Sequence, residues 1–117
     1  MAETSFDAVS GSLNSKPQME LICTSSGISA TGDYTVSNLQ NYKWIYLRVV
    51  DADKTRVSQI LPISFFTSST SEAYLAYDTR MDANRCHAAF LYVSDTVVKC
   101  SAFVRAYGEV ILLYGIK

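Results

Sequence analysis

The chain has 117 residues, of which 49% are hydrophobic and 18% are charged, so it is long enough for one packed domain and too apolar to be intrinsically disordered. Ten basic and eleven acidic residues give a formal net charge of −1, which offers no excess positive charge to attract nucleic acid or an anionic membrane. The beginning of the chain lacks the pattern of a signal peptide, and no stretch approaches the roughly 20 apolar residues of a membrane span. We therefore expect no nucleic-acid partner, no membrane insertion and no export by the general secretory route.

Residues 1–18 differ in composition from the rest of the chain. They are rich in Ser, contain Gly11 and Pro17, and have only scattered apolar side chains. This composition predicts an N-terminal arm or leader. Residues 19–117 are predicted to form a single β-sandwich domain.

Short apolar runs separated by turn residues begin at Met19 and recur at intervals of roughly eight to twelve residues. The first run, Met19 to Thr24, is followed by Gly27, Gly32 and the β-prone piece Tyr34 to Val36. This pattern predicts one hairpin.

The strongest strand signal is Tyr42 to Val50, because most of its residues are β-branched or aromatic. A polar turn at residues 51–54 leads to a strand from Val57 to Leu61. Pro62 interrupts this strand and indicates an edge or a bulge, and we expect the strand to continue from Ile63 to Phe66.

Two structures are open for residues 71–82. A capping-box pattern at their start and the helical spacing of Tyr74, Tyr77 and Met81 favour a helix. The alternative is a strand through Tyr77 that ends in the polar loop 78–85. The strands expected on both sides favour the second structure.

The last third of the chain predicts three strands, Cys86 to Val93, Val97 to Val104 and Val110 to Tyr114, separated by turns. The total is about eight strands. Their connections are too short for the crossovers that parallel pairing requires. The predicted fold is therefore all-β, an antiparallel β-sandwich of jelly-roll type.

Several of these strands are apolar on both faces. In the run from Trp44 to Val50, Arg48 is the one polar residue, whereas a strand of a two-layer sandwich normally presents one polar face to water. A second copy of the chain is the simplest cover for the extra apolar face; the alternative is that loops or the N-terminal arm lie across it. The predicted oligomer interface comprises Trp44, Tyr46, Leu112 and Tyr114.

Residues able to support catalysis are sparse. The single histidine, His87, follows Cys86 in a predicted strand, where neighbouring side chains point to opposite faces and cannot form a nucleophile pair. Asp51 and Asp53 share a turn, and turn chemistry explains them. The sequence has no phosphate-binding glycine loop and no nucleophile elbow. We predict a protein that is not an enzyme, with no cofactor and no metal.

The three cysteines, Cys23, Cys86 and Cys100, have no metal-binding spacing and stand among apolar or β-branched residues. This setting favours reduced, buried thiols. A bridge between Cys23 and Cys100 or between Cys86 and Cys100 stays open at this point.

Two features are candidates for ligand recognition. Tyrosines offer a large contact area with a polar tip, and the loop from Asp78 to Arg85 gathers several polar side chains that suit a sugar or a charged partner. A solvated loop is the alternative. The candidate ligand-binding residues are Arg80, Asp82, Asn84, Arg85, Tyr74 and Tyr77.

The run Asn41-Tyr42-Lys43-Trp44 and the closing segment Ile111 to Lys117, together with the hairpin pattern and the Pro-containing strand, resemble the C-terminal β-sandwich domains of bacteriophage fibre and tail-appendage proteins. The resemblance spans roughly residues 19–117. It implies a trimeric virion subunit, assembled in a bacterial cytoplasm, that decorates a tail or head, docks on larger virion proteins through its arm and attaches to host-surface saccharide. The sequence departs from that pattern because about 18 residues, and not a long fibre-forming region, precede the expected sandwich. Two explanations are open: the chain is a fragment, or it is a small stand-alone subunit whose arm docks on a larger particle.

Two other classes of function are weighed against a virion subunit. A carbohydrate-binding module of jelly-roll type would expose Trp44, Tyr74 and Tyr77 on one concave sheet. A hydrolase would require a pair of carboxylates at a fixed separation. Asp51 and Asp82 are the residues to test, but the sequence nominates no pair.

Overall fold

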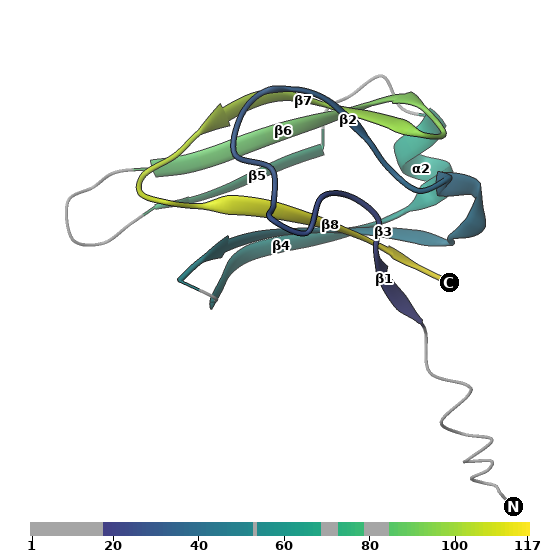
Figure 1. Ribbon diagram of the computed structural model, residues 1–117, viewed down its shortest axis with the longest axis horizontal. Coiled ribbons are helices and arrows are strands. Elements are labelled where there is room, and N and C mark those ends of the chain that lie inside the picture. Colours follow the sequence, from purple (N-terminus) through teal and green to yellow (C-terminus); the bar gives the residue numbers. More distant parts are fainter. Residues whose placement is uncertain (1–17, 53, 69–72, 79–84) are drawn as a thin grey trace, which may run out of the picture.

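The computed structural model describes residues 18–52, 54–68, 73–78 and 85–117, and all structural statements below concern these residues. They form two four-stranded sheets that lie face to face as two layers (Figure 1). Sheet A has the order β1 (Met19–Leu21), β8 (Val110–Ile116), β3 (Trp44–Asp51) and β4 (Lys54–Pro62). Sheet B has the order β2 (Gly32–Thr35), β7 (Val97–Val104), β6 (Arg85–Ser94) and β5 (Ala73–Asp78).

Every pair of neighbouring strands is antiparallel, which confirms the predicted all-β sandwich of eight strands. The chain starts in sheet A, crosses to sheet B for β2 and returns for the β3–β4 hairpin. It then forms β5, β6 and β7 in sheet B and closes with β8 between β1 and β3. The first and last strands of the domain are therefore hydrogen-bonded to each other.

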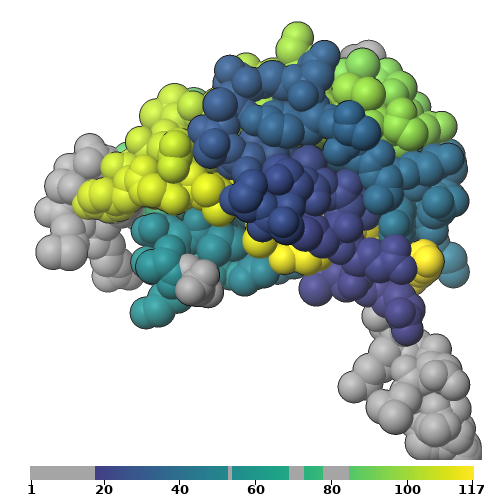
Figure 2. Space-filling view, in the orientation of Figure 1, coloured from purple at the N-terminus to yellow at the C-terminus, as the bar shows by residue number. Residues whose placement is uncertain are grey.

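The hairpin predicted near the start of the domain is wrong. β1 pairs with β8 and β2 pairs with β7, so the two strands belong to different sheets. The segment between them crosses the open side of the sandwich, where it lies over β8 in Figure 2. Ile22 and Ile28 belong to this segment and their side chains are buried in the core, and backbone hydrogen bonds join Ile28 to Ile111 in both directions. Burial of these two isoleucines outweighs a local pairing.

Gly27 allows this segment to approach β8 closely. Its φ of 88° lies in the left-handed region that favours glycine. A Cβ atom at this position would lie 2.7 Å from Cβ of Val110. The position therefore admits glycine alone without a backbone shift.

The predicted continuation of a strand beyond Pro62 is also wrong. β4 ends at Pro62, as an edge strand, and a short helix, α2 (Ile63–Ser68), follows. Ile63 and Phe66 are buried at a spacing of three, whereas Phe65 is 64% exposed. A strand would have placed Ile63 and Phe65 on one face, so packing at the end of the sandwich selects the helical spacing (Figure 1).

Of the two structures open for residues 71–82, the strand is confirmed where the chain is described. Ala73–Asp78 forms β5 and pairs with β6 from Phe90 to Arg85. The remaining residues of that segment lie outside the described ranges. Long-range pairing with β6 outweighs the local helical spacing of the tyrosines.

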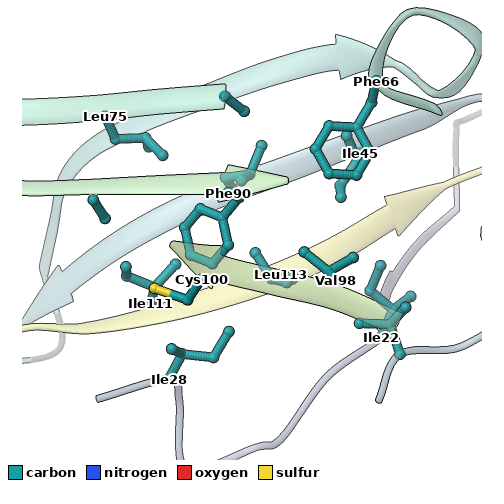
Figure 3. Close-up of a cluster of buried hydrophobic side chains, with 14 of the residues drawn as sticks. Ile22, Ile28, Ile45, Phe66, Leu75, Phe90, Val98, Cys100, Ile111 and Leu113 are labelled. Carbon is teal, nitrogen blue, oxygen red and sulfur yellow. The ribbon is translucent and has the colours of Figure 1, made fainter. Parts of the chain in front are cut away.

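The core lies between the two sheets and is built from alternate residues of the long strands (Figure 3). Phe90 of β6 is fully buried and its ring points toward sheet A. The largest fully buried apolar side chains around it are Ile28, Leu39, Ile45, Leu47, Val49, Val98, Ile111 and Leu113. Because these residues point inward, the residues between them in β3 and β8 must point outward.

Candidate binding surface

The outer face of sheet A is an extended apolar surface formed by all four of its strands. Residues directly opposite each other in neighbouring strands lie on the same face of a sheet, so the strand register defines this surface in rows. The first row is Met19, Ile116, Trp44 and Pro62; the second is Leu21, Tyr114, Tyr46 and Ile60; the third is Leu112, Arg48 and Ser58.

The largest apolar side chains of this face are open to solvent. Trp44 is 42% exposed, Ile60 50% and Met19 55%. Tyr46 and Tyr114 shield each other, with ring centroids 5.8 Å apart, and both stay partly exposed. A contiguous apolar surface of this kind on a small domain marks a site of interaction with another molecule.

Arg48 is the one charged residue among those of the three rows. Its Nε donates to Oγ1 of Thr55 at 2.6 Å and its Nη1 donates to the hydroxyl of Tyr114 at 3.0 Å. These bonds tie the guanidinium to β4 on one side and to β8 on the other. Trp, Tyr and Arg are the residue types that most often dominate the binding energy of protein interfaces.

The four residues of the predicted interface, Trp44, Tyr46, Leu112 and Tyr114, all lie on this one face. Sequence reasoning missed the rest of the surface. Val57 and Leu61 lie on one face of their strand and Ile60 on the other, so the sequence contained a signal for an apolar residue on the outer face. Met19 and Leu21 could not be placed, because the pairing of β1 with β8 was not anticipated.

The candidate ligand-binding residues do not gather into one site. Arg80, Asp82 and Asn84 lie outside the described ranges, and Arg85 begins β6 as an exposed residue. Tyr74 lies on the outer face of sheet B, where its ring packs 5.8 Å from that of His87. Tyr77 points into the sandwich from the same strand.

The expectation that Trp44, Tyr74 and Tyr77 share one concave sheet is therefore wrong. Trp44 belongs to the outer face of sheet A, Tyr74 to the outer face of sheet B, and Tyr77 to the interior. Alternation along β5 separates the two tyrosines. An aromatic platform for a sugar cannot be built from these three residues.

Glu109 is a buried carboxylate that the sequence did not reveal. Its side chain has no solvent exposure, accepts a hydrogen bond from the Tyr77 hydroxyl at 2.5 Å and another from the backbone N–H of Tyr107 at 2.7 Å. Burial alone raises the pKa of Glu109, but these hydrogen bonds outweigh it and hold the pKa below its usual value. The carboxylate thereby joins the β7–β8 turn to β5.

Burial raises the pKa of all three cysteine thiols above the usual value. All three cysteines are free thiols, and burial raises the pKa of Cys86 and of Cys100 to about 11. Cys86 points into the sandwich, while the ring of His87 packs at a tilt against that of Tyr74 outside it, as alternation predicts. Thiols that stay protonated at neutral pH are poor nucleophiles.

Among the described residues, no group of three or more His, Cys, Asp or Glu side chains is arranged to hold a metal ion. No helix in the described part of the chain has the length and hydropathy needed to cross a membrane. Asp51, weighed as a possible catalytic acid, lies 3.8 Å from the guanidinium of Arg56 in a partly exposed ion pair.

Comparison of the chain with models of protein families, with curated proteins and with solved structures found no match. The fold and the outer face of sheet A are therefore the observations from which function is argued.

Proposed function

We propose that the protein is a non-enzymatic structural and adhesive subunit of a virion, part of a bacteriophage tail or head appendage, that assembles with copies of itself. The observation that supports assembly is the outer face of sheet A, where Trp44, Tyr46 and Ile60 form an apolar surface around Arg48. The free energy of the system falls when another protein surface covers a face of this composition.

The virion assignment rests on the resemblance to phage fibre and tail-appendage domains, which also favours a trimer. The resemblance further implies attachment to larger virion proteins and to host-surface saccharide. The neutral thiols of Cys86 and Cys100 are compatible with assembly in a reducing cytoplasm. An antiserum against the purified chain tests this part of the proposal, because it must label the appendages of virions that contain the chain and leave capsids without them unlabelled.

Assembly through sheet A is tested by substituting one residue on each outer face of the sandwich. Tyr46→Asp places a charge at the centre of the outer face of sheet A, and we expect it to raise the dissociation constant of the assembly by about tenfold or more. Tyr74→Asp is the matched control, because Tyr74 is an exposed tyrosine on the outer face of sheet B. Sedimentation velocity over a range of concentrations measures both variants.

The control also defines how this proposal would fail. Dissociation by Tyr74→Asp but not by Tyr46→Asp would move the contact to sheet B. A wild-type chain that stays monomeric at every concentration would remove the proposal altogether.

A further inference from the structure

The chain enters sheet A at the end of the outer face where Trp44 lies. Met19 is paired with Ile116, and Ile116 is paired with Trp44, so residue 18 stands at the boundary of the first row. β1 runs from this row toward the row of Tyr46. Residues 1–17 are therefore attached to the domain at the end of this face where Trp44 lies.

The sequence that precedes β1 is complementary to the outer face of sheet A. Residues 1–17 lie outside the described ranges, but their composition is known. Their bulkiest apolar side chains after the first residue are Phe6, Val9 and Leu13, and the charged residues that precede Lys16 are Glu3 and Asp7, both acidic. The three rows of the face are mostly apolar, and the charged group among their residues is the positive guanidinium of Arg48.

Charge favours a contact with the arm over a contact between two identical faces. Two copies of the outer face of sheet A pressed together would bring together two surfaces that carry positive charge, and no residue of the three rows supplies a carboxylate. An arm of 17 residues reaches up to about 56 Å when extended and contains Glu3 and Asp7. It therefore adds to the contact the negative charge that the three rows lack.

We infer that residues 1–17 of one copy bind the outer face of sheet A of a neighbouring copy, with the apolar arm residues against the first two rows and the acidic ones beside Arg48. This inference rests on the proposed assembly through sheet A and names the segment that makes the contact. Exchange of an identical element between copies is a low-cost route to an oligomer. The arm is then a connector between subunits.

Trp44 provides a direct readout, because it is the only tryptophan of the chain and lies on the proposed docking surface. Its indole emits at shorter wavelength when water is excluded from it. In the full chain we expect the emission of Trp44 to shift to shorter wavelength as the concentration rises and copies associate. The midpoint of this shift gives the dissociation constant of the contact.

The arm is tested in the full chain by the triple variant Phe6→Ser, Val9→Ser and Leu13→Ser. We expect its dissociation constant to rise by about tenfold or more, with Trp44 emitting at longer wavelength at a concentration where the wild type is associated. A synthetic peptide of residues 1–17, added to this variant, is expected to restore the emission at shorter wavelength. The control variant replaces three polar arm residues, Thr4, Ser5 and Ser12, by Ala and is expected to behave as the wild type.

The charge contact is tested by exchange. Arg48→Glu is expected to weaken association, and so is the double change Glu3→Lys and Asp7→Lys. Combining all three is expected to recover most of the loss, which a merely structural role of Arg48 would not produce. Lys99→Glu serves as the control, because it makes the same change of charge at an exposed position in β7, on the outer face of sheet B.

The outcomes separate this inference from the proposed function. If the serine variant associates as strongly as the wild type and its Trp44 emission is unchanged, the copies meet without the arm; the inference then fails and assembly through sheet A stands. If the wild type is a monomer whose Trp44 emits at short wavelength at every concentration, and the serine variant loses this, the arm covers its own face. Both proposals would then be overturned.

Discussion

The buried side chain of Glu109 joins two separate parts of the chain, β5 and the β7–β8 turn. Its carboxylate holds the Tyr77 hydroxyl and the β7–β8 turn together where water is excluded. Hydrogen bonds to a buried charged group are stronger than those to neutral groups. Loss of the Glu109 charge therefore costs more stability than loss of one neutral hydrogen bond. We predict that Glu109→Gln lowers the free energy of unfolding at neutral pH by about 1–3 kcal/mol, measured by urea denaturation.

The same residue predicts a pH dependence. The pKa of Glu109 is lower in the folded protein than its usual value, so its contribution to stability is present above the unfolded pKa of about 4.3 and is lost as the pH falls through the folded value. Wild type should therefore lose its advantage over Glu109→Gln in acid. An equal difference between the two proteins at pH 7 and at pH 3 would contradict this account.

Gly115 lies under the ring of Tyr42. A Cβ atom at Gly115 would stand 2.5 Å from ring carbons of Tyr42, and this ring is held by a hydrogen bond from its hydroxyl to Glu20 at 2.8 Å. We predict that Gly115→Ala lowers the free energy of unfolding by about 1–3 kcal/mol through overpacking. Gly108→Ala is the control, because no atom other than those of Gly108 and its two chain neighbours lies within 4 Å of the Cβ that it adds. Thermal unfolding of both variants checks the prediction, and equal melting temperatures would count against the close packing of this ring.

At the scale of elements, α2 closes one end of the sandwich with Phe66, whose ring meets that of Tyr92 edge-on at 6.3 Å. We predict that Phe66→Ala costs about 3–5 kcal/mol, whereas Phe65→Ala, at an exposed position one residue earlier, changes stability by less than about 0.5 kcal/mol. Denaturant unfolding of the two variants measures which phenylalanine is buried, and so distinguishes a helix from a strand over Ile63–Ser68. A large loss from Phe65→Ala instead would restore the strand expected from the sequence.

The long strands are the elements that the sequence predicts well. β3, β6 and β7 follow from β-branched and aromatic residues, and β3 also shows its apolar outer face in the residues Trp44 and Tyr46. α2 was missed because Ile63 to Phe66 is apolar in three of its four positions and fits either period. β1 was paired wrongly because its partner, β8, stands about ninety residues away, and local turn residues contain no information about that distance.

Part of the candidate surface was also predictable from the sequence. Trp44, Tyr46, Leu112 and Tyr114 belong to strands that are apolar on both faces, so the sequence marks them as needing cover. Their union with Met19, Leu21 and Ile60 depends on the strand order of sheet A, which no local pattern specifies. The recognition set around Tyr74 and Tyr77 failed because a single β5 strand presents the two rings to opposite sides.

At the scale of the whole molecule, a two-layer sandwich shelters one face of each sheet, and the described loops do not cover the other face of sheet A. Burial of the exposed Trp44, Ile60 and Met19 favours association of the isolated chain with another molecule. Assembly would bury them without any change in the fold, because strand pairing already fixes the rows in which they lie. The central claim is therefore that copies of the chain cover this face.

Sedimentation equilibrium of the full wild-type chain across a dilution series tests that claim most directly. We predict a molar mass that is a multiple of 12.9 kDa at micromolar concentration and falls toward 12.9 kDa on dilution. A mass of one chain at every concentration, with Trp44 still accessible to an added quencher, would contradict it.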